Sequence, residues 1–266
     1  MTTPKNDGEP AELAQAGFWE HVDALRGVLI KGAATVMALM AVFFYVMPQL
    51  FDTVILAPCR PDFWLYKLLG IDDFRVNLVN IRLASQFFIH VSTSFWLGLV
   101  FSCPALFYLA WTFVKPALYP GEKRSVRWVF VFGNIMFFLG IALGYAVIFP
   151  IMLHFLADYH ISADIPNDIS LDSYMDNFIM MIFVMGVVFE MPLLAWMLGK
   201  LGLITRDIFS AYRRQAIVAL LIIAAFITPT SDPFTLMVVF IPLYMLWEFG
   251  ALLVPKRRET DSDYSL

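Results

Sequence analysis

The sequence predicts an all-α, polytopic membrane protein with six transmembrane helices, both chain ends in the cytoplasm, and short fifth and sixth helices. Of the 266 residues, 60% are hydrophobic and only 15% are charged, whereas about a quarter of the residues in a soluble domain are charged. The apolar residues gather in long runs separated by polar segments, and Lys and Arg concentrate in alternate segments. These three observations favour a chain organised by membrane spans.

The polar N-terminal segment, residues 1–17, is expected to be a disordered cytoplasmic lead, without the apolar stretch of a cleaved signal peptide. From Phe18 onward, apolar residues recur on one helical stripe that includes Val22 and Leu29. We expect a short amphipathic helix here, lying on the membrane surface. The membrane domain is expected to cover residues 18–254, followed by a cytoplasmic tail, 255–266.

The first span is predicted at residues 28–47, where Pro48 should end it. The long polar connection 49–82 is large enough to form a structured cap on the outside. The uncharged run 83–114 would reach about 48 Å as a helix, well beyond a hydrocarbon core of about 30 Å. This second helix is therefore expected to tilt strongly or to project into the cap.

The second half of the chain again alternates apolar and polar segments. In order these are a third span 128–153, an Asp-rich outside loop 154–177, a fourth span 178–199, a fifth apolar run 216–228 and a sixth span 234–254. Glu190 and Pro192 interrupt the fourth span. The fifth run would make only about 20 Å of helix, too short to cross a normal bilayer unaided.

The orientation follows from the positive charges, which favour the cytoplasmic side of a membrane protein. With the N-terminus inside, 14 of the 18 Lys and Arg residues fall in inner segments. The other four lie in the cap 49–82, and the two later outside loops have none. Both termini are therefore expected to be cytoplasmic.

Enzyme chemistry is not indicated, and no catalytic residues, metal ligands or cofactors are expected. The four His residues are scattered, and no phosphate-binding loop or nucleophile elbow is present. Ser92, Ser94 and Ser102 lie near His90 in the second span, as they would in an intramembrane serine protease. Hydroxyl side chains in membrane helices more often pack or bond to backbone, which is the favoured interpretation.

Two carboxylates lie in apolar spans. Glu190 must avoid lipid, because a charge at the bilayer centre costs about 2.5 kcal/mol or more. It could be protonated and hydrogen-bonded to backbone freed by Pro192, act as a proton site, or receive a polar group from a partner. Glu248 lies closer to the cytoplasmic end of the sixth span and could simply reach the interface.

A third carboxylate, Glu122, sits in the polar break 113–127 between the second and third spans. Pro116, Pro120 and Gly121 stiffen this predicted cytoplasmic loop. From composition alone, Glu122 beside Lys123 could be an inert, solvated surface residue.

Several short motifs occur in a fixed order: EHVDALR (20–26), WTFVKPALYPGEKR (111–124), FEMP (189–192), ITPTSDP (227–233) and IPLYMLWEFG (241–250). In these motifs and in its six spans, the chain resembles the TatC family, the receptor subunit of the twin-arginine translocase. Phe113, Pro116, Tyr119 and Glu122 occupy the matching positions of the family's F-x-x-PALY-x-x-E segment. At one place the chain departs: Ala24 stands where the family has Glu, and Asp23 precedes it.

The resemblance implies a non-enzymatic receptor in the bacterial inner membrane that binds twin-arginine signal peptides of folded proteins. Export would be driven by the proton gradient. The implied signal-peptide site comprises Glu122, Asp23, Glu20, Phe113, Tyr119 and Arg26. The implied partners are single-span subunits of the TatA and TatB type, further copies of this chain and membrane lipid, with no nucleic acid. Glu190 would be an intramembrane docking point for a partner. The competing interpretation is a proton-coupled secondary transporter with Glu190 as proton carrier, although no internal repeat supports it.

Overall fold

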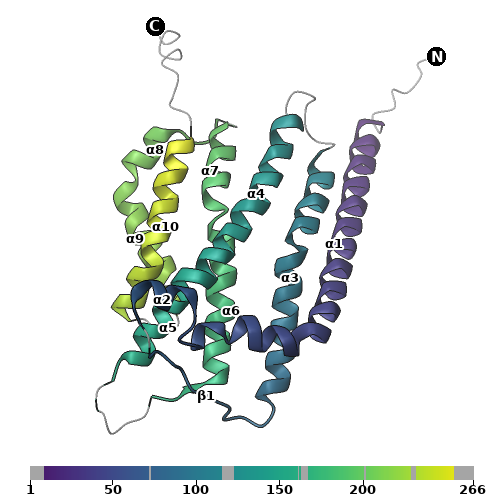
Figure 1. The fold of residues 1–266 in the computed structure, drawn as a ribbon. Helices are drawn as coiled ribbons and strands as arrows, with labels where there is room; N and C mark the ends of the chain where they lie inside the picture. The colour runs from purple at the N-terminus through teal and green to yellow at the C-terminus, as the bar shows by residue number, and fades with distance from the viewer. Residues whose placement is uncertain are drawn as a thin grey trace, which may run out of the picture. The chain divides into compact units, whose positions relative to one another are not determined.

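The computed structural model describes residues 9–71, 73–115, 123–160, 162, 167–200, 202–228 and 232–254. This part of the chain is mostly helical, as predicted (Figure 1). In chain order the elements are α1 (Glu9–Leu50), a π-helical turn (Phe51–Ile55), a 3-10 turn (Ala57–Cys59), α2 (Trp64–Leu69), β1 (Leu78–Val79), α3 (Ser85–Val114), α4 (Lys123–Leu143), a second π-helical turn (Gly144–Ile148), α5 (Phe149–Asp158), β2 (Ile169–Ser170), α6 (Leu171–Val188), α7 (Met191–Lys200), α8 (Arg206–Ala211), α9 (Arg213–Ile227) and α10 (Pro233–Leu253).

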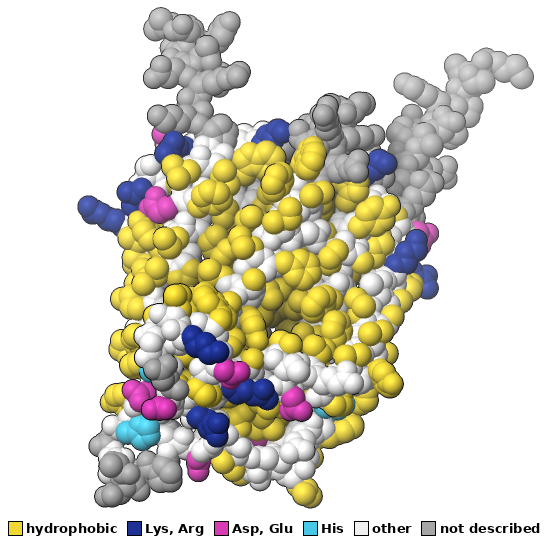
Figure 2. All heavy atoms as spheres, viewed as in Figure 1, with side chains coloured by type: hydrophobic (Ala, Val, Ile, Leu, Met, Phe, Trp, Pro, Cys, Tyr) yellow, Lys and Arg dark blue, Asp and Glu magenta, His cyan; other side chains and the backbone are white. Residues whose placement is uncertain are grey.

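Five segments of the described chain are long and apolar enough to cross a membrane: Val22–Leu69, Ser85–Phe113, Trp128–Asp158, Leu171–Lys200 and Pro233–Leu253. Many large apolar side chains on these helices are exposed, as lipid-facing side chains would be, and Figure 2 shows them over the long helices. α9 has 15 residues and is about 22 Å long, which confirms the short fifth helix.

The predicted short sixth helix is wrong. α10 has 21 residues, or about 32 Å, enough for a hydrocarbon core of about 30 Å. Its start is well defined, because the Asp232 side chain accepts a hydrogen bond from the Thr235 backbone N–H at 2.7 Å and Pro233 occupies the first turn. Pro242 lies inside the helix without ending it.

The N-terminal part also differs from the prediction. α1 is one continuous helix from Glu9, so residues 9–17 are helical, and no separate amphipathic helix precedes the first span. Pro48 does not end the span either, since α1 continues to Leu50 and then into the π-helical turn. A proline removes one helical hydrogen bond, but helices in apolar surroundings tolerate this where neighbouring groups re-satisfy the backbone.

The chain divides into two compact units, residues 1–44 with 94–130 and residues 45–93 with 131–266. In the first unit, α1 and α3 pack closely and antiparallel. A Cβ at Gly98 would lie 2.7 Å from the backbone nitrogen of Met40, and one at Gly32 would lie 3.1 Å from Leu106. Small residues let two membrane helices approach to this distance.

The second unit uses the same device between α4 and α6. A Cβ at Gly140 would lie 2.5 Å from the carbonyl oxygen of Met185, and one at Gly186 would lie 2.9 Å from Ile141. Elsewhere in this unit, α10 packs against α7 and α9.

The connection 49–82 belongs to the second unit and is structured, as predicted. The buried hydroxyl of Tyr66 lies 2.8 Å from the carbonyl oxygen of Pro58 and 3.3 Å from that of Pro150 at the start of α5. The Tyr145 hydroxyl donates to the carbonyl of Val54 at 2.8 Å. β1 pairs in parallel with β2, aligning Leu78 with Ile169. The cap is thus attached to the helices at several points.

The fourth span begins earlier than predicted, because residues 171–177 belong to α6 instead of the preceding loop. Ser170 caps the helix, its side chain accepting from the Ser173 backbone N–H, and Asp172 lies in the first turn, where the helix dipole favours an acid. The predicted interruption at Glu190 is confirmed, since a turn at residues 189–190 separates α6 from α7.

Candidate functional site

The four residues of the predicted signal-peptide site that the structure describes belong to the first unit. Asp23 and Arg26 are exposed on α1, and Phe113 is half-buried in the last turn of α3. Of Glu20, the structure describes only its place in α1. Tyr119 and Glu122 lie outside the described residues.

The antiparallel packing of α1 and α3 fixes which ends of these helices lie together. Gly32 lies against Leu106, and Gly98 lies against Met40. The two residue numbers in each pair have the same sum, so both pairs belong to one antiparallel register. Continuing this register places Arg26 level with Thr112 and Asp23 level with Lys115, the last described residue after α3. The exposed charges of α1 therefore lie at the end of the unit where α3 finishes (Figure 1).

The start of α4 lies against the same end of α3. The Phe130 ring is 5.6 Å from that of Trp111 and 6.3 Å from that of Phe107. Glu122 immediately precedes Lys123, the first residue of α4. The helices on either side of the segment that carries Glu122, α3 and α4, therefore contact each other through these rings.

Asp23 and Arg26 have no ion-pair partner within the part of the chain that the structure describes. Both side chains are exposed, so neither is committed to the packing of α1. An exposed carboxylate can accept paired hydrogen bonds from a guanidinium. The Asp23 carboxylate is therefore available to pair with a cation.

The second polar feature is Glu190, in the second unit. Its Oε1 atom is buried and has no hydrogen-bond partner among the described residues. The side chain faces α4, because a Cβ at Gly133 would lie 3.1 Å from Oε2 and 3.6 Å from Oε1. Gly133 leaves the space that the carboxylate occupies. The sequence did not predict a role for Gly133, because a glycine in an apolar span has no side-chain chemistry that would mark it as part of a site.

The sequence comparisons decide the family. A family profile described as Sec-independent protein translocase protein (TatC) matches residues 20–242. The chain belongs to the TatC family. A TatC protein of Blattabacterium sp. subsp. Periplaneta americana is 32% identical over 253 residues, covering 90% of this chain and 95% of the relative. One of Deinococcus radiodurans is 31% identical over 244 residues, covering 92% and 87%.

Solved structures agree with this TatC assignment. A crystal structure of a twin-arginine translocase receptor TatC has a TM-score of 0.72 at 27% identity, covering 88% of this chain and 97% of that one. A second, described as TatC in DDM, has a TM-score of 0.73 at 26% identity, covering 88% and 99%. The resemblance noted from the motifs is confirmed.

As a TatC protein, the chain is a non-enzymatic, multi-pass protein of the bacterial inner membrane that serves protein translocation. Because this family is not enzymatic, the interpretation as an intramembrane serine protease is wrong. The geometry of Ser102 agrees, because its buried hydroxyl donates to the carbonyl of Leu99 at 2.7 Å and so bonds to backbone. The described residues contain no group of three or more His, Cys, Asp or Glu side chains that could hold a metal ion.

Proposed function

We propose that this TatC protein is the receptor and core subunit of a twin-arginine translocase. It binds the twin-arginine signal peptides of folded proteins and nucleates a translocation complex driven by the proton gradient. The observation that carries the proposal is the register of α1 against α3, which brings exposed Asp23 level with the chain leading to Glu122. The two crystal structures compared above are described as twin-arginine translocase receptors.

The chemistry of the ligand fits this arrangement. Two adjacent guanidinium groups require two carboxylates at a fixed separation, and bidentate pairing distinguishes Arg from Lys. Glu122 supplies one carboxylate, and Asp23 or Glu20 supplies the second. Phe113, Tyr119 and the aliphatic stem of Arg26 provide apolar contact beside them.

The topology is part of the proposal. Six helices enter the membrane, with α9 as the short fifth, and both termini lie in the cytoplasm. The signal-peptide site then faces the cytoplasm, where folded precursors wait, and the cap 49–82 lies outside.

Glu190 is proposed as the docking point for a partner's membrane span. Its buried Oε1 atom has no hydrogen-bond partner among the described residues, and an unsatisfied buried carboxylate favours a polar group brought by another helix. The partners would be single-span subunits of the TatA and TatB type, assembled with further copies of this chain and surrounded by lipid.

Export of a reporter carrying a twin-arginine signal peptide tests the receptor function. In cells without another copy of the protein, Glu122→Gln is expected to abolish export, because an amide cannot form an ion pair with guanidinium. Asp207→Asn is the matched control, since Asp207 is an exposed carboxylate outside the site. Wild-type export by Glu122→Gln would refute the assignment.

Binding measurements separate the receptor from a proton-coupled transporter. The purified protein should bind a twin-arginine peptide much more tightly than its twin-lysine version, whereas a transporter should not discriminate between them. Equal binding of the two peptides would contradict the proposal.

A further inference from the structure

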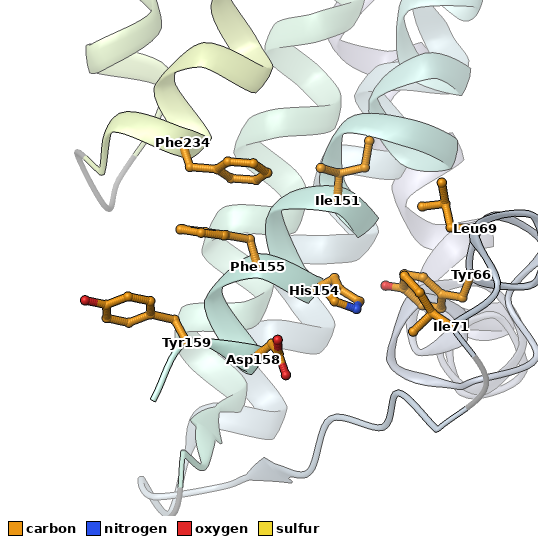
Figure 3. Close-up of a pocket in the computed structure, with 9 residues that line it drawn as sticks. All are labelled: Tyr66, Leu69, Ile71, Ile151, His154, Phe155, Asp158, Tyr159 and Phe234. Carbon is orange, nitrogen blue, oxygen red and sulfur yellow. The ribbon is translucent and has the colours of Figure 1, made fainter. Parts of the chain in front are cut away.

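A cavity of about 340 Å³ lies in the second unit, between the cap, the end of α5 and the start of α10 (Figure 3). The cap contributes Tyr66, α5 contributes His154 and Phe155, and α10 contributes Phe234. The proposed signal-peptide residues belong to the other unit, and Glu190 does not line this cavity. The cavity is therefore separate from both features described above.

The walls of the cavity are largely aromatic. The Phe155 and Phe234 rings stack with centroids 4.1 Å apart and an interplanar angle of 23°. The Tyr159 ring lies 6.1 Å from Phe155, and the His154 ring lies 6.1 Å from Tyr66. In Figure 3 the Phe155 and Phe234 rings lie face to face, with the Tyr159 ring at one side and the His154 and Tyr66 rings at the other. Aromatic faces carry negative partial charge and attract organic cations.

Asp158 is the one acid or base among the lining residues besides His154. Its side chain is exposed, and within the described chain its carboxylate has no ion pair or hydrogen bond. Among the described residues, neither Lys nor Arg lines the cavity. A single unpaired carboxylate beside several aromatic faces favours a cationic ligand and disfavours an anion.

The position of the cavity indicates where such a cation would come from. α5 ends at Asp158 and α10 begins at Pro233, so the cavity lies where two candidate spans, Trp128–Asp158 and Pro233–Leu253, meet their polar connections. Charged side chains gather over the cap of this unit, beside the hydrophobic surface of the helices (Figure 2). In membrane proteins, aromatic residues at this level lie among lipid headgroups.

We propose that this cavity binds the ammonium group of a phospholipid headgroup. The cation lies beside the Phe155–Phe234 stack and against the other aromatic rings of the lining, and the Asp158 carboxylate neutralises it. The acyl chains then lie along the exposed apolar surface of α5 and α10. A lipid bound here ties the cap to the two helices from outside the protein core.

Native mass spectrometry of the full chain, purified in detergent and stripped of lipid, tests the proposal. The probes are short-chain phosphatidylethanolamine, the same lipid with its amine acetylated, and phosphatidylglycerol of the same chain length. We expect saturable binding of the first at one site and weak binding of the other two, because both lack the cation. Equal retention of all three lipids would overturn the proposal.

Three substitutions connect that binding to the cavity. Asp158→Asn is expected to weaken phosphatidylethanolamine binding about tenfold, the effect of losing one charge-assisted hydrogen bond. Asp168→Asn removes a similar exposed charge outside the cavity and should leave binding unchanged. Tyr159→Leu removes an exposed ring with little risk to folding and should also weaken binding. Wild-type affinity in both Asp158→Asn and Tyr159→Leu would refute the site.

Two further probes separate the possible sources of the ammonium group. Glycerophosphoethanolamine carries the headgroup without acyl chains and should bind much more weakly than the lipid. If it binds equally well, the acyl chains contribute nothing and the lipid assignment fails. A short peptide with a free N-terminus should not displace the lipid, and displacement by it but not by its acetylated form would assign the cavity to a protein partner instead.

Discussion

Arg213 on α9 donates a hydrogen bond to Glu248 on α10 across 2.9 Å. The Tyr244 hydroxyl donates to the other carboxylate oxygen of Glu248 at 2.7 Å. Glu248 is therefore engaged within the protein. This network joins the short fifth helix, α9, to the sixth, α10. It lies at the start of α9 and near the end of α10, close to other basic residues in the sequence.

A double-mutant cycle measures the strength of this link. Both side chains of the pair are partly exposed, so the coupling between Arg213→Met and Glu248→Gln should be about 0.5–1 kcal/mol. Thermal unfolding of the four proteins in detergent gives the free energies. A coupling near zero would mean that the pair is merely adjacent and that apolar contacts hold α9 to α10.

The close approach of α4 and α6 predicts a larger effect at Gly140. A Cβ there would lie 2.5 Å from the Met185 carbonyl and 2.8 Å from the Phe189 ring, so Gly140→Ala should destabilise the protein by about 1–3 kcal/mol. A Cβ at Gly27 on α1 would have no neighbour within 4 Å, so Gly27 is the matched control. Gly27→Ala should be neutral or slightly stabilising, because Ala favours helix. Similar unfolding temperatures for the two variants would contradict the packing.

Apolar run length and charge placement were enough to predict most of the helices. The structured cap, the interruption at Glu190 and the short α9 all follow from such local signals. Helix ends were less predictable, because they depend on single hydrogen bonds. Capped by Ser170, α6 begins within the segment that its composition predicts to be an Asp-rich loop. Pro48 lies within α1 and does not end it.

Contacts between distant segments could not be predicted from one sequence. Nothing in the sequence indicates that Gly133 makes room for the Glu190 carboxylate, or that Tyr66 reaches Pro150. The family motif located Glu122 but not its surroundings. The register that places Asp23 near the end of α3 came from Gly32 and Gly98, two residues that carry no chemical signal.

The Tyr66 hydroxyl should stabilise the cap measurably. It is buried against the carbonyl oxygens of Pro58 and Pro150, so Tyr66→Phe removes this buried hydrogen bond and should cost about 1–3 kcal/mol. Tyr45 is 86% exposed, and Tyr45→Phe should have no effect. Hydrogen exchange would locate the change, with faster exchange expected in residues 57–71. An unchanged exchange pattern would show that the hydroxyl does not secure the cap.

The departure at Ala24 allows a rescue experiment on the proposed receptor site. If Asp23 provides the second carboxylate, Asp23→Asn should weaken binding of a twin-arginine peptide about tenfold, as the loss of a charge-assisted hydrogen bond would. Adding Ala24→Glu to this variant should restore binding, because it places a carboxylate at the family's position. Fluorescence anisotropy with a labelled peptide gives both values. Undiminished binding by Asp23→Asn would shift the role to Glu20.

Glu190 should matter more for assembly than for folding. Because no hydrogen bond to its buried Oε1 atom is present among the described residues to be lost, Glu190→Gln should change the free energy of unfolding by no more than about 1 kcal/mol. The same variant should lose cysteine crosslinks between α7 and a partner's membrane span, since the amide offers that partner a weaker acceptor. Leu194→Met, at an exposed position of α7, is the control and should keep both stability and crosslinks. Marked destabilisation with intact crosslinks would instead make Glu190 a structural residue of the helix turn.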